Sequence, residues 1–375
     1  MDFGFTEEQQ ELGALARRIL EDKVTEAVLR EADAGEARFD KATWEALADA
    51  NLLGIGLPED VGGSGYGLVE QCVVLEEVGR CVAPVPVAAT TLLGAAPIAA
   101  FGTEAQRTRW VAPAAEGRVV LTAALAEPAN RDLTRPALRA TVAKGGGWQL
   151  DGVKTCVLAG TLADAFLVPA STPDGDVIVA IVERGAKGLQ IDAQDLTNRD
   201  AGALLTFAGV VAGADDILAG FDRGADVLRW MVERSTIALC AQQLGVLARA
   251  LEMTADYTKQ RVQFDVPIAT FQAVGHRLAD AYIDVEGLRL TLWQAVWRLE
   301  EGLPASTEVE VAKYWAAEAA HRVGHAVVHV HGGTGIDEDY PLHRYFIAAK
   351  AIEFALGSAT DQLLAIGRTF AATPE

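Results

Sequence analysis

The segment YTKQRVQFDVPIATFQAVGHRLAD (257–280) separates two long stretches in which apolar residues recur at helical spacing. The break within it is QFDVP, where the proline cannot continue a helix. Two further breaks, EGLPAS and HGGTGIDEDYP, divide the chain that follows. The helical patterns so delimited cover 222–258, 268–302, 307–330 and 341–372. Four long helices with short connections predict an antiparallel bundle.

Upstream of this bundle, the chain is helical first and rich in β-favouring residues afterwards. Residues 5–22 begin with Thr6 and carry Glu and Gln in the first turn, the signature of a capped amphipathic helix. Other helical patterns cover 41–51, 67–80, 87–101 and 104–115. From about 119 to 220, short β-favouring runs alternate with turns such as KGGG, TPDGD and RGAKG, which is typical of a small antiparallel sheet.

The expected fold is therefore α+β in three parts. An N-terminal α-helical domain covers 1–117, a middle antiparallel β domain covers 118–221, and a C-terminal four-helix bundle covers 222–375. A chain of 375 residues is long enough to bury a large core.

Charge and composition exclude several classes of partner. The formal net charge is −20, which argues against nucleic acid and against anionic membrane surfaces. No apolar run is long enough to span a bilayer. The N-terminus is acidic and polar, unlike a signal peptide, and the four cysteines form no C-x-x-C pair. We expect a cytoplasmic protein with reduced thiols.

Four segments resemble a known family, and they occur in that family's order. They are GIGLPEDVGGSGYGLVEQCVVLEEVGR (54–80), GLQIDAQDLTNRDAGALLTFAGVVAGADDILAG (188–220), the opening segment 257–280, and HVHGGTGIDEDYPLHRYF (329–346). Together they resemble the acyl-CoA dehydrogenases over essentially the whole chain. The family fold is a helical domain, a β domain and a four-helix bundle, in agreement with the pattern above.

The resemblance implies FAD-dependent α,β-dehydrogenation of an acyl-CoA thioester, with an electron-transfer flavoprotein as acceptor. This chemistry needs a base for the α-proton, the flavin N5 for the β-hydride, and hydrogen bonds to the thioester carbonyl. In this family FAD lies across a subunit interface. One subunit holds the flavin ring, and its neighbour supplies groups for the pyrophosphate and adenine.

The groups that a subunit lends to its neighbour are present in this sequence. Arg261 matches the family's pyrophosphate arginine, whose guanidinium suits phosphate oxygens. The other residues that match lent positions are Gln263, Phe264, Ile268, Phe271, Gln272, Gly332 and Gly333. His329 stands where glutamine is usual, and Asp265 where glycine is usual. Asp tolerates left-handed backbone, so we expect the turn at Asp265 to persist.

The groups that a subunit keeps for its own flavin are altered. In AEPANRD (126–132), Glu127 and Pro128 remain, but Ala126 replaces the family's hydroxyl and the Gly-Ser pair is absent. In KTCVLAG (154–160), Cys156 stands at an aromatic position and Leu158 at the threonine position.

The catalytic base is also replaced at both positions that the family uses. Leu356 stands at the commoner position and Ser235 at the alternative one, and neither side chain can remove a proton as a carboxylate does. Glu233 and Glu353 are nearby carboxylates that could act as a displaced base. The sequence therefore leaves the catalytic residue unassigned.

The selective loss resembles the non-catalytic partner subunit of actinobacterial α2β2 acyl-CoA dehydrogenases of the steroid side-chain type. The resemblance implies a related, catalytic chain as partner. Two alternatives stay open: a self-sufficient homotetramer with a displaced base, Glu233 or Glu353, and a structural or acyl-CoA-binding protein without catalysis. His321, His325 and His329 recur every four residues, but the outer pair is about 12 Å apart along a helix, so we expect no metal site.

Overall fold

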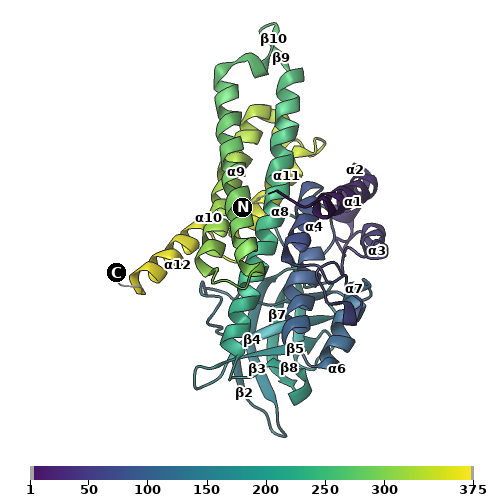
Figure 1. The fold of residues 1–375 in the computed structure, drawn as a ribbon, viewed down its shortest axis with the longest axis vertical. Helices are drawn as coiled ribbons and strands as arrows, with labels where there is room; N and C mark the ends of the chain where they lie inside the picture. The colour runs from purple at the N-terminus through teal and green to yellow at the C-terminus, as the bar shows by residue number, and fades with distance from the viewer. Residues whose placement is uncertain (1–3, 373–375) are drawn as a thin grey trace. The chain divides into compact units, whose positions relative to one another are not determined.

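A computed structural model describes residues 4–372 and divides into two compact units. The first, here called the bundle unit, contains the residues up to 26, residues 72–83 and the residues from 237 onward. The second, the sheet unit, contains residues 27–71 and 84–236. Figure 1 shows the helices and strands of both.

Helices precede and follow the strands of the main sheet, in the order that the sequence predicts. The α-helices are α1 (Glu7–Lys23), α2 (Glu26–Ala34), α3 (Lys41–Asp49), α4 (Leu68–Arg80), α5 (Ala96–Phe101), α6 (Glu104–Gln106), α7 (Ala112–Ala115), α8 (Gly224–Gln260), α9 (Gln272–Glu300), α10 (Ser306–His331), α11 (Leu342–Phe354) and α12 (Ala359–Ala372). Two π-helices, η2 (Ala89–Ala95) and η3 (Arg107–Val111), interrupt the predicted helices 87–101 and 104–115. Short 3-10 turns are η1 (Glu59–Val61), η4 (Ala214–Asp216), η5 (Ile268–Thr270) and η6 (Gly332–Ile336).

The strands form one large sheet and one small hairpin. The strands are β1 (Leu121–Ala123), β2 (Arg139–Val142), β3 (Trp148–Val157), β4 (Ala165–Ser171), β5 (Val177–Glu183), β6 (Leu189–Asp195), β7 (Ala201–Ala212), β8 (Ile217–Ala219), β9 (Val262–Gln263) and β10 (Val266–Pro267). Neither β6 nor α2 was expected from the sequence.

The first helix of the bundle unit begins where its capping residues predict. The hydroxyl of Thr6 accepts a hydrogen bond from the backbone N–H of Gln9 at 3.2 Å, and the Gln9 side chain accepts from the Thr6 N–H at 3.0 Å. This reciprocal pair satisfies two donors that a helix start otherwise leaves free. The capped helix predicted at 5–22 is confirmed.

Helix α10 lies at the centre of the bundle unit. It packs against α9, α11 and α12, and half of its buried residues are alanines. Small side chains let neighbouring helices approach closely. Helix α9 contributes larger apolar residues to the same core, among them Val285, Leu288 and Leu292. The predicted helical bundle is confirmed.

The prediction of one continuous helix over 341–372 is wrong. The structure breaks it into α11 and α12, separated by residues 355–358. Leu356 has a φ of 56° and Gly357 a φ of 108°, so both occupy the left-handed region that a continuous helix excludes. The break falls at the position where the resemblance places the catalytic base.

The sheet unit is built on a mostly antiparallel sheet in the order β6-β7-β3-β2-β4-β5-β8. The antiparallel expectation is correct for most pairs but not for all. Strand β1 pairs in parallel with β4, and β2 also meets β4 in parallel at Arg139 and Ser171. Apolar residues of β3, β4, β5 and β7, such as Leu150, Phe166 and Ile178, form the core of this unit.

Across residues 4–372, no helix combines the length and the apolar character that a crossing of the bilayer requires.

Candidate functional site

The segment 257–280 contains a tight hairpin between α8 and α9. Strands β9 and β10 pair antiparallel, with Gln263 opposite Val266 (Figure 1). The two residues between them, Phe264 and Asp265, have φ values of 53° and 66°. Positive φ at both central residues is the geometry of a two-residue hairpin turn. Asp265 therefore adopts the left-handed conformation expected of it.

The side chains predicted to touch a cofactor point away from the core of the chain. Phe264 is 87% exposed, and Arg261, Gln263 and Gln272 are exposed as well. Phe271 and Ile268 are half-buried, and the ring of Phe271 meets Phe264 edge-on. Within residues 4–372, the Arg261 guanidinium has no carboxylate at ion-pair distance, so its charge remains available for an anion.

The turn after α10 brings the other predicted residues to the same unit. Gly332 ends the helix with a φ of 62°, and its N–H donates to the carbonyl oxygens of Val328 and His329. The side chain of His329 is exposed. A Cβ built on Gly332 or Gly333 would meet no atom within 4 Å, so open space lies beside both.

One aromatic contact links the hairpin to this turn. The imidazole of His331, directly before Gly332, stacks on the ring of Tyr257, and the centroids are 4.1 Å apart. Tyr257 lies one helical turn before Arg261 on α8. The two groups of predicted residues, far apart in sequence, are thus joined through Tyr257 and His331, which the sequence analysis did not single out.

The two candidate base positions lie on different units. Leu356 is half-buried in the bundle unit, and Ser235, on α8, is fully buried in the sheet unit. The Ser235 hydroxyl oxygen has no hydrogen-bond partner among the described residues. A leucine side chain and an isolated hydroxyl do not supply a base of the carboxylate type.

The two displaced carboxylates differ in their surroundings. Glu353 is buried, and its carboxylate lies 2.6 Å from the ammonium of Lys350 and 3.6 Å from Nδ1 of His321. The Glu353 carboxylate is thus engaged by two neighbouring side chains of the bundle unit. Glu233 is half-buried on α8 and belongs to the sheet unit.

Glu127, the retained residue of the flavin-side motif, is engaged within the sheet unit. Its carboxylate lies 2.7 Å from the ammonium of Lys154 and accepts from the Asn130 side chain and from the backbone N–H groups of Ala137 and Leu138. Burial alone raises the pKa of Glu127, but Lys154 and these donors outweigh it and lower the pKa. The carboxylate is therefore ionised and fully occupied.

Cys156 lies within a bulge near the end of β3, and Leu158 directly follows that strand. The pairing of β3 with β7 shifts register between Lys154 and Val157, and Cys156 has a φ of 49°. The Cys156 N–H donates to the side chain of Gln194 on β6 at 2.7 Å, and the thiol is exposed. Leu158 is half-buried, and its carbonyl oxygen accepts from Thr122.

The histidines of α10 do not gather a third ligand. The rings of His321 and His325 are 4.6 Å apart, and His329 lies a further turn along the helix. Over the described part of the chain, no three His, Cys, Asp or Glu residues are arranged to hold a metal ion.

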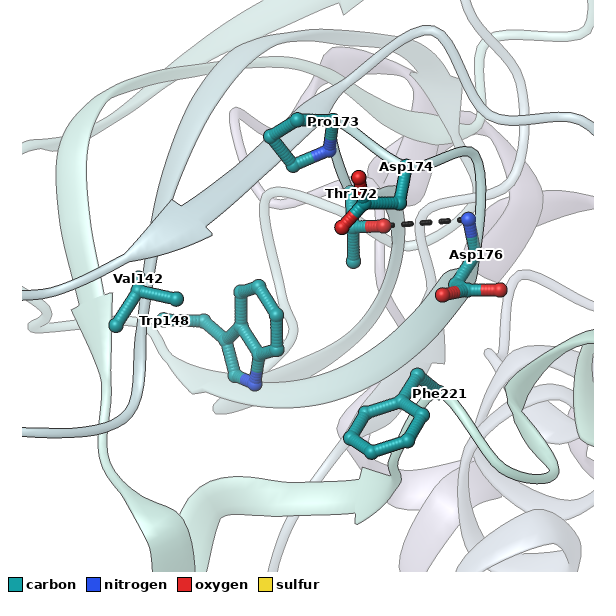
Figure 2. Close-up of a pocket in the computed structure, with 7 residues that line it drawn as sticks. All are labelled: Val142, Trp148, Thr172, Pro173, Asp174, Asp176 and Phe221. Atoms are coloured by element: carbon teal, nitrogen blue, oxygen red, sulfur yellow. Dashed lines mark hydrogen bonds between the residues drawn. The ribbon is translucent and has the colours of Figure 1, made fainter.

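The sheet unit also carries a groove of about 330 Å³, and none of the site residues predicted from the sequence lines it. Figure 2 shows the aromatic side chains of Trp148 and Phe221 beside the turn that contains Asp174 and Asp176. The Thr172 hydroxyl accepts from the Asp176 N–H and shapes this turn.

Comparison with known proteins places the chain in a family. The family models "Acyl-CoA dehydrogenase, N-terminal domain" and "Acyl-CoA dehydrogenase, C-terminal domain" match residues 6–118 and 222–371. The chain is 44% identical to acyl-CoA dehydrogenase FadE27 of Mycobacterium tuberculosis, over the full length of both.

Two solved structures share both fold and sequence with the chain. A chain of the ChsE4-ChsE5 complex from Mycobacterium tuberculosis is 45% identical, with full coverage of both chains and a TM-score of 0.95. A variant of the steroid ACAD Tcur3481-Tcur3483 is 42% identical, with 98% of each chain covered and a TM-score of 0.92. By sequence, by domain models and by fold, this chain belongs to the acyl-CoA dehydrogenase family.

Proposed function

We propose that the chain is a subunit of a heteromeric acyl-CoA dehydrogenase that completes the FAD site of a related, catalytic chain. In this proposal it supplies the pyrophosphate and adenine half of the site and has no working flavin half or base of its own. The family's cofactor is FAD, so the proposal concerns which half of a shared site this chain provides.

The surroundings of Gly333 provide the main support for this proposal. Its φ is not in the positive range, and open space lies where a Cβ would point. Neither backbone conformation nor packing among residues 4–372 therefore requires glycine at this position. A group from outside the chain that approaches this backbone closely would leave no room for a Cβ. The unpaired guanidinium of Arg261 and the exposed ring of Phe264 fit the same kind of ligand, a dinucleotide with a charged pyrophosphate and a flat base.

The flavin-side residues support the second part of the proposal. The Glu127 carboxylate is saturated by Lys154, Asn130 and two backbone N–H groups, so it has no lone pair in a free direction for a cofactor. Leu158 offers no side-chain donor where the resemblance expects a threonine. Leu356 and Ser235 occupy the two base positions.

The division of labour follows from these residues. FAD, when bound, accepts the β-hydride of the acyl-CoA. Arg261 neutralises the pyrophosphate, Gln263 and Gln272 supply hydrogen bonds, and Gly332 and Gly333 let backbone approach the dinucleotide. The base for the α-proton comes from the partner subunit.

The wider assignment rests on the relatives. Two of them are described as the ChsE4-ChsE5 complex and as a Tcur3481-Tcur3483 steroid ACAD, which supports assembly with an unlike chain and a steroid substrate. We propose an α2β2 assembly with a related chain and a steroid side-chain CoA thioester as substrate. A further neighbour, 29% identical, is an electron-transferring flavoprotein structure, in keeping with such a protein as electron acceptor. We place the complex in the cytoplasm.

The proposed function is tested by removing the Arg261 guanidinium in the assembled complex. The chain is co-expressed with a related acyl-CoA dehydrogenase chain with which it forms a complex, as wild type, Arg261→Ala and Lys259→Ala. Lys259 lies two residues earlier on α8, is exposed, and pairs with Asp256, so its variant controls for loss of one positive charge. We expect Arg261→Ala to form the complex without its flavin absorption band, and Lys259→Ala to keep it. Full FAD content in Arg261→Ala would refute the proposal.

A further inference from the structure

Two aromatic residues hold the imidazole of His331, the last residue of α10. Its ring stacks on Tyr257, with the planes inclined by 25° and the centroids 4.1 Å apart. Its Nε2 lies 3.2 Å from the hydroxyl oxygen of Tyr340. His331 is only 4% exposed, so these contacts replace water around the ring. All three residues belong to the bundle unit.

The hydrogen bonds fix which nitrogen of His331 carries the proton. Nδ1 lies 2.8 Å from the carbonyl oxygen of Val327, and a carbonyl oxygen only accepts, so Nδ1 is the donor. Burial lowers the pKa of His331, and the bond to Val327 opposes this only in part. The imidazole is therefore neutral, and its Nε2 accepts from the hydroxyl of Tyr340.

The contact between Tyr257 and His331 joins two stretches of backbone that are 74 residues apart in sequence. The backbone N–H of Arg261 donates to the carbonyl oxygen of Tyr257 at 2.8 Å, so Tyr257 is one helical turn from the guanidinium. On the other side, His331 directly precedes Gly332. A shift of either ring therefore moves Arg261 relative to the Gly332–Gly333 turn.

We propose that Tyr257, His331 and Tyr340 form a positioning cluster that fixes the separation between Arg261 and the Gly332–Gly333 turn before FAD binds. The inference rests on the proposed function, because the cluster itself does not touch the cofactor. FAD that spans both elements binds best when they are already held at the right distance. If they move independently, part of the binding free energy is spent on ordering them.

A positioning role and a purely structural role predict different behaviour of variants when FAD is added to saturation. Loss of a core contact lowers the stability of the bundle and leaves the affinity of correctly folded complex for FAD unchanged. Loss of preorganisation raises the dissociation constant for FAD and leaves turnover normal once FAD is saturating. The distinction needs variants that alter one contact at a time.

The experiment uses the co-expressed complex after removal of its flavin, titrated with FAD. Tyr340→Phe removes only the hydroxyl donor to Nε2, and Tyr257→Leu removes the stacked ring. Tyr257→Phe keeps that ring and serves as the matched control, since the Tyr257 hydroxyl makes only a 3.5 Å contact with the His331 carbonyl oxygen. We expect the dissociation constant to rise on the order of tenfold in Tyr257→Leu, less in Tyr340→Phe, and hardly at all in Tyr257→Phe. Turnover should return to the wild-type value at saturating FAD.

The outcomes separate this inference from the proposed function. If Tyr340→Phe and Tyr257→Leu bind FAD as tightly as wild type while Arg261→Ala loses it, the positioning cluster is refuted and the lent half-site stands. If Arg261→Ala also binds FAD normally, the proposed function itself is wrong. If saturating FAD does not restore turnover in Tyr257→Leu, the role of the cluster is structural and the inference is overturned.

Discussion

The side-chain nitrogen of Lys313 lies 2.9 Å from the carbonyl oxygen of Ile352, four residues before Leu356. The same ammonium is 3.1 Å from the carbonyl oxygen of Glu353. Lys313 thus caps the end of α11 from within the core, because the last carbonyl groups of a helix have no partner of their own. It holds the break at residues 355–358 in place even though no base stands there.

The buried lysine predicts a pH-dependent stability. Burial lowers the pKa of Lys313 from 10.5 to about 8. Between these two values the unfolded chain keeps the proton that the folded chain has lost, so unfolding takes up a proton. The free energy of unfolding should therefore rise with pH across this window, by a few kcal/mol at most.

Lys313→Met removes this titration and keeps most of the volume. As the pH rises from about 8 towards 10.5, we expect the urea concentration at the unfolding midpoint to increase for the wild type relative to Lys313→Met. Midpoints that change in parallel in the two proteins across this range would contradict the assignment.

The backbone of Leu356 predicts that replacing this leucine by glycine costs less stability than the same change elsewhere. Its φ of 56° is unfavourable for a branched side chain and favourable for glycine. Leu364 in α12 is exposed, and the same change there places glycine inside a helix. We expect Leu356→Gly to be less destabilising than Leu364→Gly by about 1 kcal/mol or more. Thermal unfolding compares them, and equal losses would argue against backbone strain at Leu356.

The buried pair of Lys154 and Glu127 predicts a large effect on the sheet unit. Their side chains are 0% and 2% exposed. Glu127→Gln leaves the Lys154 ammonium buried without its counterion, which should cost about 3–5 kcal/mol. Glu183→Gln is the control, because Glu183 and Arg109 form a pair that is about half exposed, where the expected cost is below about 1 kcal/mol. Similar losses in the two variants, measured by urea unfolding, would contradict this account.

The displaced carboxylates give a direct test of the homotetramer alternative. Glu353 is paired with Lys350, so we expect Glu353→Gln to lower stability slightly and to leave turnover of the complex unchanged. Glu233→Gln should likewise keep its turnover. Steady-state assays of complexes with normal flavin content measure the turnover of each variant against the wild type. A collapse of turnover in either variant would identify that carboxylate as the base.

Much of the fold could be predicted because its signals are local. The capping residues around Thr6, the turn glycines at 145–147 and the proline in QFDVP each act within a few residues, and the elements they delimit are observed. The hairpin turn at Asp265 is of the same kind. The segments that resemble the acyl-CoA dehydrogenases also include helix ends and turns, where few residue types fit the backbone. The family fold could therefore be predicted from them.

The rest depends on contacts between distant residues. The break at Leu356 is stabilised by Lys313, 43 residues earlier, and nothing in AKAIEFALGSAT predicts that a leucine adopts left-handed backbone. The parallel pairing of β1 with β4 likewise joins segments with a hairpin between them.

The candidate site shows the same division. Arg261, Gly332 and Gly333 could be assigned from their motifs, but their link through Tyr257 and His331 requires the stacked geometry. Glu127 was interpreted as a remnant of a flavin motif, and only the structure shows its carboxylate bonded to Lys154. The sequence identifies the residue type, whereas its hydrogen-bond partners in the structure decide whether the side chain can still bind a cofactor.

The flavin content of the chain, alone and in complex, decides whether the chain lends half of an FAD site or holds a complete one. The chain is purified by itself and with the related chain co-expressed, and the FAD absorption band is compared with protein concentration. The account predicts no stoichiometric FAD on the isolated chain, and one FAD for each pair of unlike chains in the complex. Stoichiometric FAD on the isolated chain, together with dehydrogenase activity on an acyl-CoA, would contradict it.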